Sequence, residues 1–89
     1  MFDTGVSIGE YAGGANAKFV KIGTATFWFS YETCIAFEDD KGFVASENIA
    51  GTTMGRHLNT IARYKEDRLP WEEFTAKLQS CLKRHKLAG

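Results

Sequence analysis

The sequence predicts an α+β domain: an antiparallel sheet of three or four strands, packed on one face by two C-terminal helices. Two observations predict this fold class. Residues 18–48 are rich in aromatic and β-branched side chains and are interrupted by turn-forming residues, a pattern typical of short strands. After Gly51, apolar residues recur with the 3.6-residue period of a helix. A chain of 89 residues accommodates one such domain.

Four segments are the expected strands: KFVKI, TATFWFSY, CIAFE and FVASEN. Between the last two, residues 39–42 read Asp-Asp-Lys-Gly, which is typical of a hairpin turn. This hairpin predicts that Phe37 lies beside Val44. Residues 1–15 are glycine-rich, and we expect them to be a flexible or irregular N-terminal segment before a single α+β domain at residues 16–89.

The turn around residues 32–33 leaves two registers open. A two-residue loop places Trp28 on the same sheet face as Phe37, whereas a three-residue loop places Trp28 on the opposite face. We favour the three-residue loop, because it leaves Trp28 among small polar residues and collects most large apolar side chains on one face. That core face then consists of Phe27, Phe29, Tyr31, Ile35, Phe37 and Val44.

Two helices are expected in the C-terminal part of the chain. The first begins at Thr52 or Thr53, either of which can act as its N-cap. Its apolar stripe consists of Met54, Leu58, Ile61 and Ala62. The second begins near Pro70, which suits the first turn of a helix. Its stripe consists of Trp71, Phe74, Leu78, Cys81 and Leu82.

Charge and segment composition exclude several classes of protein. The formal net charge is zero, but residues 1–50 carry seven acidic and three basic residues, whereas residues 51–89 carry four and eight. We therefore expect a bipolar molecule. The chain has no apolar stretch long enough to cross a membrane, and its N-terminus does not resemble a signal or transit peptide. We expect a cytoplasmic protein with no membrane partner.

Catalytic and metal-binding patterns are weak, so we expect no enzyme, no cofactor and no metal. Cys34 and Cys81 are far apart, and His57 and His85 fall on different predicted helices without a recognised zinc spacing. A nucleophile such as Cys34 or Ser30 has no catalytic motif around it.

Binding is the expected role, and four residues are the predicted contacts. Trp28 on an open sheet face would be an interface anchor for a protein partner. Arg56, Asn59 and Arg63 line the polar face of the first helix. Because arginine and asparagine contact phosphates and base edges, this basic face supports an alternative function as a nucleic-acid-binding accessory protein. The sequence does not decide whether the chain also forms a homodimer.

Two sequence blocks carry a resemblance to a known group of proteins. FWFSYETCIAF at residues 27–37 and TTMGRHLN at residues 52–59 resemble FSYxTxIAF-like and TTxGxHLN-like blocks of small proteins from bacteriophages and other mobile elements. The resemblance implies a non-enzymatic phage protein in the host cytoplasm that binds and modulates a host protein complex, for example by inhibiting a host defence system. The family-like positions are Tyr31, Thr33, Thr53, Gly55, His57 and Asn59.

Overall fold

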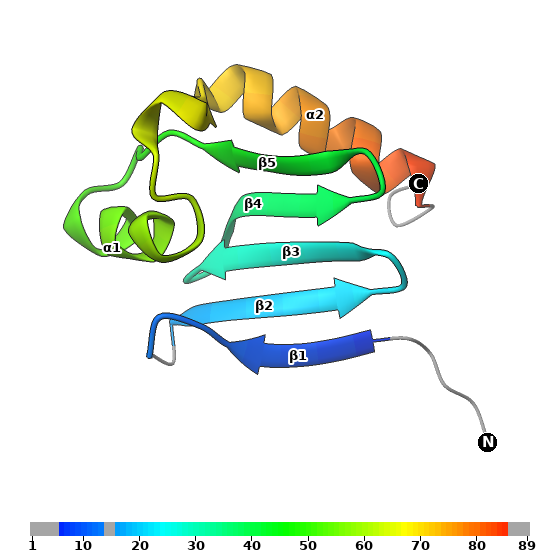
Figure 1. The fold of residues 1–89 in the computed structure, drawn as a ribbon, viewed down its shortest axis with the longest axis horizontal. Coiled ribbons are helices and arrows are strands. Elements are labelled where there is room, and N and C mark those ends of the chain that lie inside the picture. Colours follow the sequence, from blue (N-terminus) through cyan, green and yellow to red (C-terminus); the bar gives the residue numbers. More distant parts are fainter. Residues whose placement is uncertain (1–5, 14–15, 86–89) are drawn as a thin grey trace.

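The computed structural model describes residues 6–13 and 16–85, which form an α+β fold with two helices and a six-stranded mixed sheet (Figure 1). The strands follow one another across the sheet in chain order, and β1 to β5 are antiparallel neighbours. The short β6 pairs parallel to β5. The elements are β1 (Val6–Glu10), β2 (Ala17–Ile22), β3 (Ala25–Ser30), β4 (Thr33–Asp39), β5 (Gly42–Ser46), α1 (Thr52–Ile61), a 3-10 turn η1 (Lys65–Asp67), β6 (Arg68–Leu69) and α2 (Trp71–Arg84).

The prediction of three or four strands understates the sheet at both ends. Val6–Glu10, within the segment expected to be irregular, forms β1 and pairs with β2 along its whole length. Its Gly9 lies opposite Phe19, whose ring occupies the space that a Cβ at position 9 would need. β6 has two residues, too few to show a period. The rest of the expected irregular segment, residues 1–5 and 14–15, lies outside the described residues.

The hairpin between β4 and β5 is confirmed. Phe37 pairs with Val44, and Asp39 pairs with Gly42 around a two-residue loop. Gly42 has a φ of 126°, a conformation that glycine adopts without steric cost. The Asp39 carboxylate accepts a hydrogen bond from the backbone N–H of Lys41 at 2.9 Å, which closes the turn.

The connection between β3 and β4 combines a two-residue loop with a β-bulge. Ser30 pairs with Thr33, so the loop is shorter than the one we favoured. However, Cys34 pairs with Phe29 and Ala36 with Trp28, which leaves Ile35 as an extra residue in β4. The bulge shifts the register by one, so Phe27 still pairs with Phe37 and Trp28 still faces the other way. Ile35 joins the Trp28 face instead of the expected Phe37 face.

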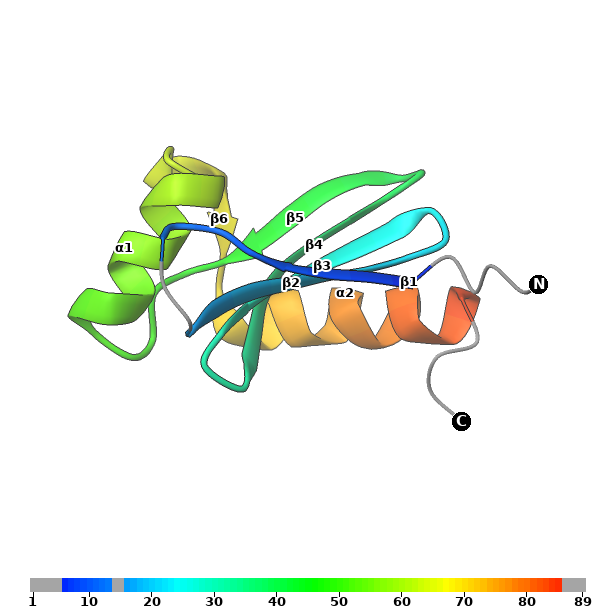
Figure 2. The same cartoon turned by 90° about the horizontal axis from the view of Figure 1, so that it is seen from below.

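The two helices cover opposite faces of the sheet, which corrects the prediction that both pack on one face (Figure 2). The physical reason is that the meander has two apolar faces and each needs a cover. The buried residues of the α1 side are Ile35, Ala36, Ala45, Met54, Leu58 and Ala62. Those of the α2 side are Ala25, Phe27, Phe37, Phe74 and Cys81. Neither described helix combines the length and apolarity needed to cross a membrane.

The start of α1 differs from the prediction of a threonine cap. Gly51, with a φ of 108°, is the N-cap residue, and it makes no side-chain cap. The side chain of Asn48 organises this turn instead, because its Oδ1 accepts the N–H groups of Ala50 and Gly51. Its Nδ2 donates to the carbonyl of Gly51 at 2.8 Å. The entry to α1 is therefore set by one asparagine that precedes it.

Trp28→Ala tests the position of Trp28 beneath α1. Trp28 is half-buried, packs against the α1 core and makes an edge-on contact with Phe43 at 5.6 Å between ring centroids. We expect the substitution to lower the free energy of unfolding by about 2–4 kcal/mol in a urea titration. Tyr64→Ala, at a 58% exposed aromatic residue, is the control and should change it by less than about 1 kcal/mol. Equal effects of the two substitutions would contradict this packing.

Candidate functional site

The predicted helix-face residues lie on α1 and just beyond its end, and two of them have contacts within the chain. Arg56 and Asn59 are exposed on α1, and Arg63 is exposed just after its last turn. The guanidinium of Arg68 donates to Asn59 Oδ1 at 3.0 Å and also to the carbonyl of Ala62, where it caps the helix. The guanidinium of Arg63 stacks over the ring of Tyr64 at 5.6 Å.

Trp28 is not the freely exposed anchor that the sequence analysis expected. It lies on the face covered by α1, where Phe43 and the α1 core contact it. The exposed neighbour in this aromatic pair is Phe43, which keeps 42% of its surface accessible. Whether Trp28 contacts a partner stays a prediction, but much of its surface already serves the fold.

The two sequence blocks meet where the β3–β4 turn approaches α1. Nδ1 of His57 lies 2.7 Å from Oγ of Ser30, a hydrogen bond that joins α1 to β3. Beside Ser30 is a pocket of about 230 Å³. Its lining includes Tyr31, Thr33 and Thr53, all family-like positions of the resemblance. Both blocks therefore contribute to one local structure.

The Ser30–His57 pair has the chemistry of a structural contact. Both residues are buried, with 5% and 4% of their surfaces exposed, and Ser30 also lines the pocket beside it. Burial, and secondarily the charge of Arg56, lowers the pKa of His57 below its usual value, which keeps the imidazole neutral. No carboxylate among the described residues hydrogen-bonds to His57 as the orienting group of a triad would.

An apolar groove lies between β2 and α2, on the opposite face of the sheet from α1. Its volume is about 270 Å³. Strand residues with side chains on the α2 side form its floor, and two leucines of α2 form its wall. The lining residues are Val20, Ile22, Phe27, Phe29, Cys34, Leu78 and Leu82. Burial raises the pKa of Cys34 to about 12, so its thiol stays protonated and contributes an apolar surface.

The apolar surface continues from this groove to the edge of the sheet. Val6 pairs with Ile22 and Ile8 with Val20, so all four side chains share the α2 face. Val6 is 46% exposed and Ile8 is 69% exposed. α2 runs beside β5, at the far side of the sheet from β1, and leaves this part of the face uncovered (Figure 1). β1 is an edge strand, since β2 is its one neighbour among the described residues.

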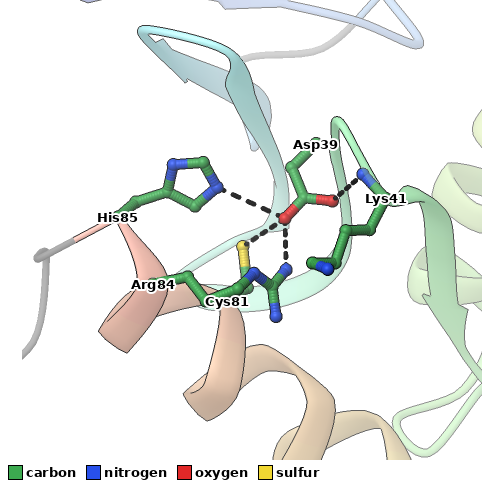
Figure 3. A network of polar contacts seen from close by, with 5 residues as sticks. All are labelled: Asp39, Lys41, Cys81, Arg84 and His85. Carbon is green, nitrogen blue, oxygen red and sulfur yellow. Dashed lines mark hydrogen bonds and ion pairs between the residues drawn. The ribbon is translucent and has the colours of Figure 1, made fainter.

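A buried polar network joins the β4–β5 hairpin to the end of α2 (Figure 3). Asp39 is its centre, with 1% of its side chain exposed. Its Oδ2 accepts a hydrogen bond from the guanidinium of Arg84 and lies 3.3 Å from Nε2 of His85 and 3.5 Å from Sγ of Cys81. Lys41 contributes its backbone N–H to Oδ1. Strand and helix are thereby joined through one carboxylate.

The network keeps the Asp39 carboxylate charged. Burial by itself would raise the pKa of Asp39, but hydrogen bonds from Lys41 N–H, Arg84 and His85 hold that pKa well below its usual range. Burial, together with the neighbouring Asp39 charge, raises the pKa of Cys81 to about 11. The site thus combines a carboxylate, a thiol and an imidazole within 4.8 Å of one another.

The sequence analysis missed this network and the groove for different reasons. Cys81 and His85 are four residues apart at the end of the predicted second helix, so they are expected on one helix face. This spacing could have predicted that the two side chains lie close together. Asp39 was read only as a turn residue, and its approach to α2 depends on the fold. The groove is formed by side chains of β2, β3, β4 and α2, and their approach depends on the fold. The exposed apolar edge beside it belongs to β1, a strand that the sequence analysis did not expect.

Comparison with known proteins places the chain in a family. Residues 7–76 match DUF8033, a family of unknown function, and the chain therefore belongs to that family. The match covers all but the first residue of β1 and reaches into the first half of α2. No curated protein and no solved structure matches the chain significantly.

The buried His57 predicts a loss of stability on acidification. Its pKa is lowered in the folded state, so the unfolded chain binds a proton more readily below the ordinary histidine pKa of about 6.5. Stability is therefore fully present above that pH and is lost as the pH falls through the lower folded pKa. We expect urea midpoints to fall between about pH 7.5 and pH 5.5, and to fall less in His57→Gln. An identical pH profile of the two proteins would contradict a neutral buried His57.

Proposed function

We propose that this member of DUF8033 is a non-enzymatic interaction protein that binds a protein partner along β1 and the adjoining apolar groove. The observation that supports the proposal is the continuous apolar surface from Ile8, 69% exposed, to the groove beside α2. An apolar patch of this kind at a sheet edge is a recognised mark of a binding surface. An uncovered edge strand also promotes uncontrolled association unless a partner pairs with it.

The partner that fits this surface is an extended segment that adds a strand to β1. Its backbone would pair with the outer N–H and C=O groups of β1, which supply affinity without sequence preference. Its side chains alternate between the two faces, so every second residue would lie on the α2 side beside Ile8. Apolar residues at those alternate positions would pack on Val6 and Ile8, at the outer end of the apolar surface, and give specificity. We therefore propose a partner strand with alternating apolar residues.

The resemblance to mobile-element proteins suggests that the partner is a protein of the host cell. We propose that the chain is phage-encoded, acts in the host cytoplasm and modulates a host protein complex, with a defence complex as the concrete form. Strand addition suits this role, because a short protein whose sheet edge binds an extended segment can withhold that segment from a larger assembly. This step rests on analogy between sequences.

The basic face of α1 supports the alternative, a nucleic-acid-binding accessory protein. Arg56 and Arg63 are both exposed and belong to the basic half of the sequence. Against it, Asn59 already accepts a hydrogen bond from Arg68, and the formal net charge of the chain is zero. The uncovered apolar surface favours a protein partner over a phosphate backbone, which requires positive charge.

Two matched variants of β1 test the proposal in pull-downs from host-cell lysate. Ile8→Lys puts a charge on the apolar face at an exposed position, so it should reduce partner capture more than about tenfold without lowering stability. Ser7→Lys is the control, because it introduces the same side chain one residue away on the opposite face of β1. It should capture the partner at the wild-type level after nuclease treatment.

The helix-face double variant, Arg56→Glu with Arg63→Glu, distinguishes binding of a protein partner from binding of nucleic acid. Under the protein-partner proposal it captures the partner normally, and capture depends weakly on salt. Loss of capture in this variant and on nuclease treatment, with Ile8→Lys unaffected, would replace the proposal with nucleic-acid binding. Equal capture by Ile8→Lys and Ser7→Lys would contradict binding at the groove.

A further inference from the structure

The polar network around Asp39 brings together three groups that bind transition metals. These are the carboxylate of Asp39 at the end of β4, the thiol of Cys81 and the imidazole of His85. Cys81 lies in the last turn of α2 and His85 is the C-cap residue that follows it, and the hairpin brings Asp39 beside both (Figure 3). One carboxylate, one thiolate and one imidazole form a ligand set that suits zinc.

The distances between these atoms agree with a tetrahedral centre. With zinc bonds of about 2.0–2.3 Å, neighbouring oxygen and nitrogen ligands lie about 3.3 Å apart, and oxygen and sulfur ligands about 3.5 Å apart. The corresponding distances here are 3.3 Å from Asp39 Oδ2 to His85 Nε2 and 3.5 Å from the same oxygen to Cys81 Sγ. All three ligand atoms lie within 4.8 Å of one another.

We propose that Asp39, Cys81 and His85 bind a zinc ion, with water as the fourth ligand. The thiol proton of Cys81 is released to solvent as the thiolate binds the metal. The backbone N–H of Lys41 holds the other carboxylate oxygen of Asp39 and fixes its orientation, as outer-shell groups do in metal sites. A cleft of about 500 Å³ is lined by Asp39 and Arg84, so it lies beside the proposed site on the Arg84 side.

Arg84 is the competing cation at this site. Its guanidinium contacts the same Asp39 oxygen that would bind the metal, so the ion pair and the zinc complex exclude each other. The Arg84 side chain is 37% exposed and can turn to solvent, whereas Asp39 stays buried. Under this proposal, Asp39 forms either the ion pair with Arg84 or the zinc complex, and zinc binding replaces the first with the second. It is independent of the groove, and two of its ligands lie beyond residue 76, where the family match ends.

Cobalt and zinc titrations of the metal-free 89-residue chain test the proposal. We expect one cobalt ion per chain, with a thiolate-to-cobalt charge-transfer band and the visible absorption of a tetrahedral centre. Cys34→Ser, which removes the other thiol, should keep the band. Cys81→Ser should lose it, and His85→Gln should weaken zinc binding by more than about a hundredfold, the upper range for loss of an outer-shell group. His85 is at the helix end with 21% of its side chain exposed, so its variant folds even if Cys81→Ser does not.

Arg84→Gln distinguishes a zinc site from a purely structural network, because only a zinc site would gain affinity for the metal. Removing the competing cation should raise the affinity for zinc at least tenfold in competition with a chelator, while lowering the stability of the metal-free protein. An affinity that Arg84→Gln leaves unchanged or lowers would overturn the proposal. Absence of the cobalt band in the wild-type protein, or a band that survives in Cys81→Ser, would also overturn it and leave Asp39 as the centre of an ion-pair network only.

Discussion

The bulge at Ile35 determines which side chains of the sheet face each helix. Without the extra residue, the two-residue loop after Ser30 would pair Thr26 with Phe37 and place Trp28 on the Phe37 face. With it, Phe27 pairs with Phe37 beneath α2, and Ile35 joins Ala36 beneath α1. Three consecutive residues of β4, 35–37, are buried, which a regular strand with one covered face does not achieve. The sheet consequently has two apolar faces.

Two short helices cannot cover both faces of a six-stranded sheet completely. α1 is ten residues long and packs across one end of its face, where His57 hydrogen-bonds to Ser30. α2 is longer, but it lies beside β5 and reaches the hairpin through Asp39. Val20 and Ile22 of β2 are half-buried beside α2, whereas no other described element covers the α2 side of β1, where Ile8 is exposed at the edge. The proposed binding surface is thus a consequence of where the helices attach. The Asp39 contact fixes the far end of α2 and would change in strength if zinc replaced Arg84.

The sequence predicted those features that local patterns determine. The α+β class, the hairpin at residues 39–42 and the stripe of α2 follow from period and turn chemistry, and the structure confirms them. The bulge was not predictable, because a loop of two residues with a bulge and a loop of three residues give the same faces to Phe27 and Trp28. β1 was missed because residues 1–15 contain four glycines and few large apolar side chains. The opposite placement of the helices depends on the second apolar face, which Ile35 at the bulge helps to form. Of the predicted contacts, Trp28 and Asn59 have roles in the fold, whereas Arg56 and Arg63 are exposed as expected.

The most direct test of the central claim is amide hydrogen exchange with and without the captured partner. If a partner strand pairs with β1, amides of residues 6–10 should gain protection on binding, and those of α1 should exchange as in the free protein. Val6 and Ile8 would report contact on the α2 side of β1 through line broadening or shifts of their methyl signals. Protection confined to α1 around Arg56, with β1 unchanged, would contradict the account and assign binding to the basic helix face.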